Sequence, residues 1–154
     1  MKIEKTARIN IVSEQWTAGE QAEPIKLMSI GKLQYDDKRD EWTVSYDESE
    51  ATGMEGTKTS LCLTRSGNIL FSRSGSIQMK VLFESGNHYQ SQMETPYGLI
   101  NVSIMTNEAR GQLSERGGEI VLAYSLNLPN QEKVSTKLNL QIEAEGVSSE
   151  GLAN

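Results

Sequence analysis

Cysteine, proline and aromatic residues are scarce in this chain of 154 residues, which has one cysteine, three prolines and an aromatic fraction of 6%. The single cysteine, Cys62, excludes an intramolecular disulfide and favours a reducing, cytoplasmic compartment. The sequence also lacks a run of 18 apolar residues, so we expect no membrane-spanning segment. The first residues lack the apolar stretch of a signal peptide, which is consistent with the same compartment.

Residues suited to catalysis are equally few. The only histidine, His88, alternates with Gln90 and Gln92 and is expected on the wet face of a strand. One histidine excludes a three-histidine metal site, and no Gly-x-Ser-x-Gly motif supplies a nucleophile. Cys62 has no activating neighbour in the sequence. We therefore expect neither enzyme activity nor a cofactor.

The charge balance argues against nucleic-acid partners. The chain carries 21 acidic and 15 basic residues, a formal net charge of -6, and an acidic protein repels phosphate backbones. The segment 53–59 echoes a phosphate-binding loop, but Thr57 separates Gly56 from Lys58 and the segment precedes a strand pattern instead of a helix. We expect no nucleotide site there.

What the sequence does contain is a pattern of alternating apolar residues. Ile120, Leu122, Tyr124, Leu126 and Leu128 alternate with smaller or polar residues, and a second such run follows at 134–143. Successive side chains of a strand point to opposite faces, so this period indicates one face in a core and one in water. Within the first run, Leu122 is predicted to point inward and its neighbour Val121 outward.

The same pattern predicts about ten strands and no convincing helix. They are expected near 2–14, 25–35, 42–48, 57–65, 69–73, 77–83, 89–93, 100–113, 120–128 and 134–143, with a bulge in the eighth. Gly and Asn in the intervening turns suit tight hairpins. The fold class is therefore all-β, with 1–145 as a single domain and 146–154 as a flexible C-terminal tail.

Regular hairpin spacing favours an antiparallel up-and-down meander. A sheet of about ten strands leaves two exposed edges unless it closes on itself, so a barrel is the first choice and a two-sheet sandwich the second. The residues predicted inside the barrel are Trp42, Val44, Ile69, Phe71, Val81, Phe83, Val102, Ile104, Leu122, Tyr124, Leu138 and Leu140.

Two charged residues share the inward phase. Glu48 follows Trp42, Val44 and Tyr46, while Arg73 follows Ile69 and Phe71. A charge on the inner face is costly unless it is paired. The two residues could pair with each other, or Arg73 could bind an anionic ligand. A third interpretation is that both lie at strand ends and are solvated at the barrel rim.

Several segments in order resemble a known family. These segments are 46–49, 56–59, 73–75, 95–98, 117–118 and 124–126, which read YDES, GTKT, RSG, TPYG, GG and YSL. Their order and spacing are similar to those of the YwiB-like bacterial proteins, a family of uncharacterised function, and the resemblance covers about Ile3 to Glu145. It implies a calycin or lipocalin-like barrel in a bacterial cytoplasm and brings no catalytic residues. The chain lacks the Gly-x-Trp signature of true lipocalins, since Trp16 is followed by Thr17.

Two functions remain open. The barrel interior could bind a small apolar or amphipathic anion such as a fatty acid, and the expected ligand-binding residues are Arg73, Glu48, Phe71, Phe83, Leu122 and Tyr124. Alternatively, its own side chains fill the barrel, and the protein is a structural or protein-interaction module, for which a homodimer is also open. A connected apolar cavity of roughly 300 Å³ or more would favour the first function.

Overall fold

The computed structural model describes residues 2–17, 19–21, 23–48 and 55–145. The predicted tail at 146–154 and most of the loop at 49–56 lie outside this range. The described residues form eleven strands: β1 Lys2–Thr17, β2 Glu20–Gln21, β3 Ile25–Asp36, β4 Glu41–Asp47, β5 Lys58–Leu63, β6 Ile69–Ser74, β7 Met79–Phe83, β8 His88–Thr95, β9 Gly98–Ser114, β10 Gly117–Asn127 and β11 Val134–Ala144. None of the described residues forms a helix long and apolar enough to cross a membrane.

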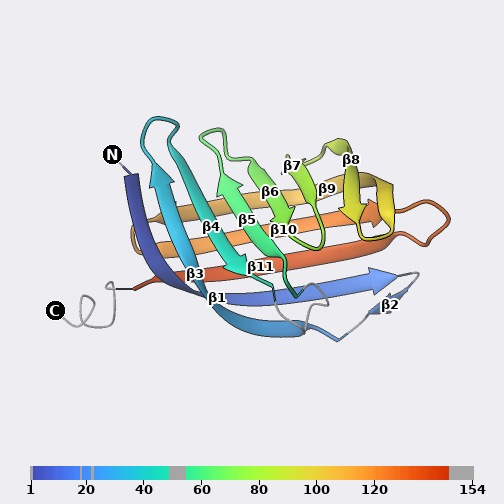
Figure 1. Ribbon diagram of the computed structural model, residues 1–154, viewed down its shortest axis with the longest axis horizontal. Helices are drawn as coiled ribbons and strands as arrows, with labels where there is room; N and C mark the ends of the chain where they lie inside the picture. Colours follow the sequence, from blue (N-terminus) through green and yellow to red (C-terminus); the bar gives the residue numbers. More distant parts are fainter. Residues whose placement is uncertain (1, 18, 22, 49–54, 146–154) are drawn as a thin grey trace.

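All the strand pairs are antiparallel, in the order β7-β6-β5-β4-β3-β1-β11-β10-β9-β8, with the short β2 beside β1. Apart from β2, and from β7 and β8 at the two ends of this order, consecutive strands are therefore neighbours. β1 joins β11 along a register from Ala7↔Ala144 to Thr17↔Val134. The shorter strands β4 to β7 cross over the long strands β9 to β11, and β1 and β3 curve from one wall to the other (Figure 1). The predicted all-β meander barrel of about ten strands is confirmed.

The barrel is nearly closed, and its seam lies between β7 and β8. These two strands meet in a single bridge, Gln78↔Glu94, supported by a hydrogen bond of 2.9 Å from the Ser91 hydroxyl to the Lys80 carbonyl. The expected hairpin around 85–87 is wrong, because its turn connects strands that form no ladder. Instead the amide of Gly86 donates to the carbonyl of Thr106 on β9 at 2.8 Å.

The core follows the predicted inward phase. All twelve residues predicted inside belong to the core cluster or pack against it, with Trp42 and Tyr124 partly buried and the others buried. Phe71 and Phe83 meet edge to face with ring centroids 5.8 Å apart. The predicted bulge is present in β9, where the register with β10 shifts between Ala123 and Tyr124.

Val121 departs from the expectation of a wet outer face. It lies outside the core cluster, in agreement with its outward phase, yet it is only 1% exposed. Its cross-strand partners are Arg110 on β9 and Asn139 on β11. Their long polar side chains belong to a hydrogen-bonded group with Glu119 and Gln141, and this group shields Val121 from water.

Candidate functional site

A cavity of about 290 Å³ opens at one end of the barrel, and eleven side chains line it. They come from both walls: Ile11, Ser13 and Gln15 from β1, Ile25 and Leu27 from β3, Tyr46 and Glu48 at the end of β4, Arg73 from β6, Tyr124 from β10, and Thr136 and Leu138 from β11. Strand alternation brings them together, because each residue continues the inward phase of its strand toward the same barrel end. The cavity is amphipathic, because aliphatic groups line it together with hydroxyl, carboxyl and guanidinium groups.

The charged part of the cavity is built around Glu48 and Arg73. One guanidinium nitrogen of Arg73 lies 3.7 Å from the Glu48 carboxylate, and their side chains are 18% and 3% exposed. The Thr59 hydroxyl donates a hydrogen bond to the same carboxylate and accepts one from the Arg73 Nε at 3.4 Å. Of the alternatives that the sequence left open, pairing of the two charges is the one observed. The interpretation that both are solvated rim charges is wrong.

Aromatic side chains support this group of charges. The Arg73 guanidinium stacks over the Phe71 ring at 4.6 Å, a cation–π contact that holds the head group against the wall. Burial is the main cause that raises the pKa of the Tyr46 phenol, and the nearby Glu48 carboxylate raises it further. Burial likewise raises the pKa of Tyr124. Both phenols are therefore neutral hydrogen-bonding groups at physiological pH.

The six residues proposed from the sequence divide into two sets. Arg73, Glu48 and Tyr124 line the cavity. Phe71, Phe83 and Leu122 are at most 1% exposed, belong to the packed core and are not among the lining residues. Sequence reasoning overlooked Ser13, Thr136 and Tyr46 as lining groups. The signal was available, because Ser13 continues the phase of Ile9 and Ile11, and Thr136 that of Leu138.

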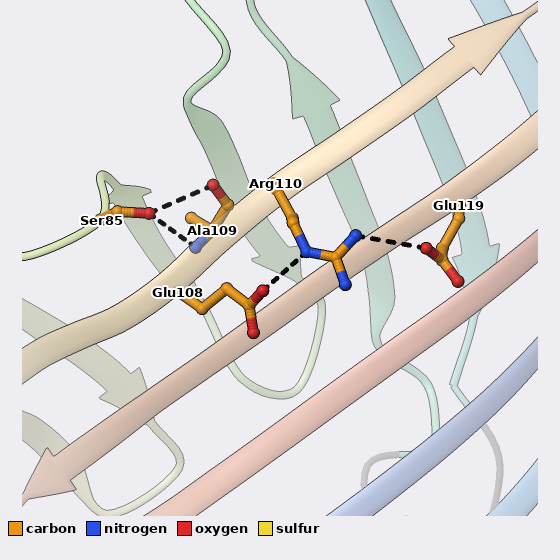
Figure 2. A network of polar contacts seen from close by, with 5 residues as sticks. All are labelled: Ser85, Glu108, Ala109, Arg110 and Glu119. Carbon is orange, nitrogen blue, oxygen red and sulfur yellow. Dashed lines mark hydrogen bonds and ion pairs between the residues drawn. The ribbon is translucent and has the colours of Figure 1, made fainter.

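A broader hollow of about 950 Å³ lies on the outer face of β9 to β11, beside Gly111, Gly117 and Gly118. Figure 2 shows the polar network there: Arg110 donates to Glu108 at 2.6 Å and to Glu119 at 3.4 Å. The hydrogen bond to Glu108 is the main cause that raises the pKa of Arg110. In the same view the Ser85 hydroxyl accepts a hydrogen bond from the Ala109 amide at 3.0 Å. These groups are solvated and mutually paired, so this open groove is a weaker candidate than the cavity.

The other residues singled out from the sequence lie apart from the cavity. His88 is exposed at the start of β8, in agreement with the prediction. Cys62 is half-buried on β5, and burial raises the pKa of its thiol, which disfavours the reactive thiolate. Lys58 and Thr59 of the loop-like motif belong to β5 and precede no helix. Within the described ranges, no three His, Cys, Asp or Glu side chains gather in a way that could hold a metal ion.

Comparison with known proteins places the chain in a family. The model of the family described as "Domain of unknown function (DUF1934)" matches residues 9–140. The chain belongs to this family. It is also similar to the structure described as "Crystal structure of ywiB protein from Bacillus subtilis", with a TM-score of 0.79 and 20% sequence identity over 92% of both chains. No match is found among curated proteins. The resemblance to the YwiB-like family is thus confirmed, and at this identity the structural likeness shows the fold alone.

Proposed function

We propose that this DUF1934 protein is a non-enzymatic binding module that holds a small amphipathic anion in the cavity beside Arg73. The observation that carries the proposal is the mixed lining of the cavity. Its aliphatic side chains suit an apolar tail, and the same lining presents the Arg73 guanidinium and four hydroxyl-bearing residues. Small-molecule sites are mostly apolar with a few polar groups that fix orientation.

The guanidinium has room for an anion. Its Nη2 faces Glu48 and its Nε faces Thr59, while no hydrogen bond or ion pair among the described residues involves its Nη1. A carboxylate could therefore approach this nitrogen from the cavity, with hydroxyl donors at Tyr46, Tyr124 and Thr136 nearby. Charge-assisted hydrogen bonds of this kind are the strong ones. The contact with Glu48, at 3.7 Å, is longer than the hydrogen bonds of a two-fold fork between a guanidinium and a carboxylate.

The size of the cavity limits the ligand. At about 290 Å³ it lies just below the range of roughly 300–1,000 Å³ for small-molecule sites. Because Phe71, Phe83 and Leu122 pack tightly in the core, a tail would follow Ile25 and Leu27 along β3 toward the open end. We therefore propose a short or medium-length carboxylate in place of a long-chain fatty acid. The single Cys62 supports a reducing compartment, which we propose is the bacterial cytoplasm.

The alternative is a structural or protein-interaction module with a filled barrel. The packed core and the Glu48–Arg73 pair favour it, because the pair neutralises the cation without any ligand. The two functions differ in what happens when Glu48 loses its charge. In a binding module, the Glu48→Gln variant frees the guanidinium and removes a repulsive carboxylate, so it binds anions more tightly. In a structural module, neither form binds.

The test is calorimetric titration with octanoate, with octanol as a probe that has the same tail and no charge. We expect saturable octanoate binding, at least tenfold weaker in Arg73→Gln and tighter in Glu48→Gln, and tenfold corresponds to about 1.4 kcal/mol. Arg65→Gln is the matched control, since its guanidinium lies in an exposed turn with only a long contact of 3.9 Å to Asp40. If neither folded wild type nor folded Glu48→Gln binds octanoate, the structural module is the correct function.

A further inference from the structure

The first half of β3 has a free edge. Its residues from Ile25 to Gly31 pair with β1, whereas β4 pairs with β3 only from Lys32 to Asp36. The strands part at Gly31, where a Cβ atom would lie 2.1 Å from the Ser45 carbonyl oxygen, so only glycine permits this close approach. No described strand covers the outer edge of 25–31. An edge of this kind presents unpaired N–H and C=O groups that can accept another strand.

Apolar side chains are exposed along this edge. Met28 and Ile30 are each 58% exposed on the outer face of β3. Of the other large apolar residues exposed in the described ranges, Ile25 lines the cavity on the inner face, and Tyr97 and Leu99 belong to the β8–β9 hairpin. Single exposed apolar residues are ordinary, but a cluster beside an unpaired edge indicates an interaction surface.

Basic residues frame the apolar pair. Lys26, Met28, Ile30 and Lys32 alternate along β3 and are all exposed, so they share its outer face. Arg8 of β1 lies opposite Ile30 in the register. A hollow of about 270 Å³ beside Ile30 is lined by Lys32, Lys58 and the single acid Asp47. Lys32 also forms an exposed ion pair with Glu4 at 3.6 Å. With Lys26, Arg8 and Lys58 the surface still has more basic than acidic groups, on a chain with a net charge of -6.

We propose that the edge of β3 from Ile25 to Gly31 binds an extended acidic segment of another protein as an added strand. Main-chain hydrogen bonds to an edge provide affinity, and alternate side chains provide specificity. The outer face of the added strand would read acidic, apolar, apolar, acidic at every second residue. The first three of these side chains would lie beside Lys26, Met28 and Ile30 on the free edge. Because β4 pairs with β3 from Lys32 onward, the last acidic side chain would extend past the main-chain pairing toward the exposed Lys32 ammonium. The inference is independent of the cavity ligand, since it uses the edge and outer face of β3 and not its inner face.

A second copy of the chain is a poorer occupant. Antiparallel pairing of two β3 edges would bring the basic surface of one copy, which contains Lys26 and Lys32, beside the same surface of the other copy. Like charges close to each other on paired strands are destabilising. Lysines on edge strands are also a known device against self-pairing. Charge complementarity therefore favours an acidic segment of a different protein.

The probe is the end-blocked peptide Glu-Thr-Val-Thr-Val-Thr-Glu, with a fluorescent label, measured by anisotropy on the full chain. We expect saturable binding that Met28→Glu weakens at least tenfold. The double variant Lys26→Glu/Lys32→Glu is expected to lose this peptide and to gain the version with Lys at both ends. Leu99→Glu is the matched control, because Leu99 is 65% exposed in a different hairpin and its substitution is expected to leave binding unchanged. Bound peptide is also expected to slow amide hydrogen exchange within 25–31.

Three results would overturn the proposal. The first is no saturable binding of the peptide to the folded wild type at millimolar concentration. The second is equal binding of the acidic and basic peptides, which would remove the charge argument. The third is a dimer in sedimentation equilibrium that Met28→Glu dissociates, because a second copy would then occupy the edge.

Discussion

The Glu48 carboxylate and the Arg73 guanidinium form an ion pair at 3.7 Å in the wall of the cavity, where Glu48 is almost completely buried. The pair joins the end of β4 to β6 across β5, whose Thr59 hydroxyl bonds to both partners. A buried pair of this kind offsets its own desolvation only while both members are present. Substitution of one member or of both should therefore change the free energy of unfolding by different amounts.

We predict a strongly non-additive double-mutant cycle at this pair. Arg73→Met alone leaves a buried carboxylate without its cation and is expected to cost about 3–5 kcal/mol of unfolding free energy. Adding Glu48→Gln removes the stranded charge, so the double variant is expected to recover part of that loss. Chemical denaturation of the four proteins measures the coupling. Additive losses would mean that the contact contributes nothing to stability.

A second prediction concerns two buried threonine hydroxyls. Among the described residues, the Thr106 Oγ1 has no hydrogen-bond partner, whereas the Thr59 hydroxyl donates to Glu48. Thr106→Val removes an unsatisfied group with little change in shape, so it is expected to be neutral or stabilising by about 1 kcal/mol. Thr59→Val is expected to destabilise by about 1–3 kcal/mol because it removes one hydrogen-bond donor from a buried carboxylate. Thermal unfolding of both variants provides the comparison, and a loss at Thr106 similar to that at Thr59 would show that Thr106 has a partner.

The third prediction compares neighbours on opposite faces of β10. Leu122 is fully buried in the core, so Leu122→Ala is expected to cost about 2–5 kcal/mol. Val121 is 1% exposed beneath polar side chains, and Val121→Ala is expected to cost a smaller but measurable amount, about 1–2 kcal/mol. The control is Leu99→Ala, for which a change within about 0.5 kcal/mol is expected at an exposed site. Denaturant midpoints of the three variants give the order of their stabilities. If Val121→Ala lost as little stability as Leu99→Ala, the polar side chains over Val121 would not exclude water in solution.

The fourth prediction concerns alkaline stability. Burial raises the pKa of the Tyr46 and Tyr124 phenols in the folded protein. Below the ordinary tyrosine pKa of about 10, both states keep the proton and these phenols add no pH dependence. Above it, the unfolded chain releases protons that the folded protein retains, so stability falls as pH rises.

Denaturation midpoints measured from about pH 8 to pH 11 test this linkage. We expect Tyr46→Phe and Tyr124→Phe each to reduce the slope above about pH 10, whereas Tyr97→Phe, at a residue 97% exposed, is expected to leave it unchanged. If stability fell with pH equally steeply in the wild type and in both buried variants, groups other than these two phenols would cause the loss of stability at alkaline pH.

Alternation along single strands was enough to predict the core and the inward phase of the pair. Leu122, Leu140 and Ile104 follow from a period of two, and so do Glu48 and Arg73, because the phase continues to the strand ends. The bulge in β9 also left a signal, since the apolar residues change phase along that strand. These are local properties that neighbouring residues determine.

The remaining features depend on contacts between distant segments. The burial of Val121 depends on side chains from β9 and β11. The position of the seam depends on β7 and β8 forming no ladder, with an isolated bridge at Gln78↔Glu94. The need for glycine at position 31 comes from the Ser45 carbonyl of another strand. A single sequence contains no record of these registers, so the cavity lining could be predicted only in part.

The pairing of β1 with β11 also has a consequence for the order of folding. Ala7 lies opposite Ala144, so this ladder joins segments separated by almost the whole described length of the chain. During synthesis, β1 can form a hairpin with β3 early, but its other edge has no partner until β11 leaves the ribosome. Contacts between such distant segments slow folding. A nascent chain halted before Val134 would therefore expose the β1 edge and depend on chaperones until synthesis resumed.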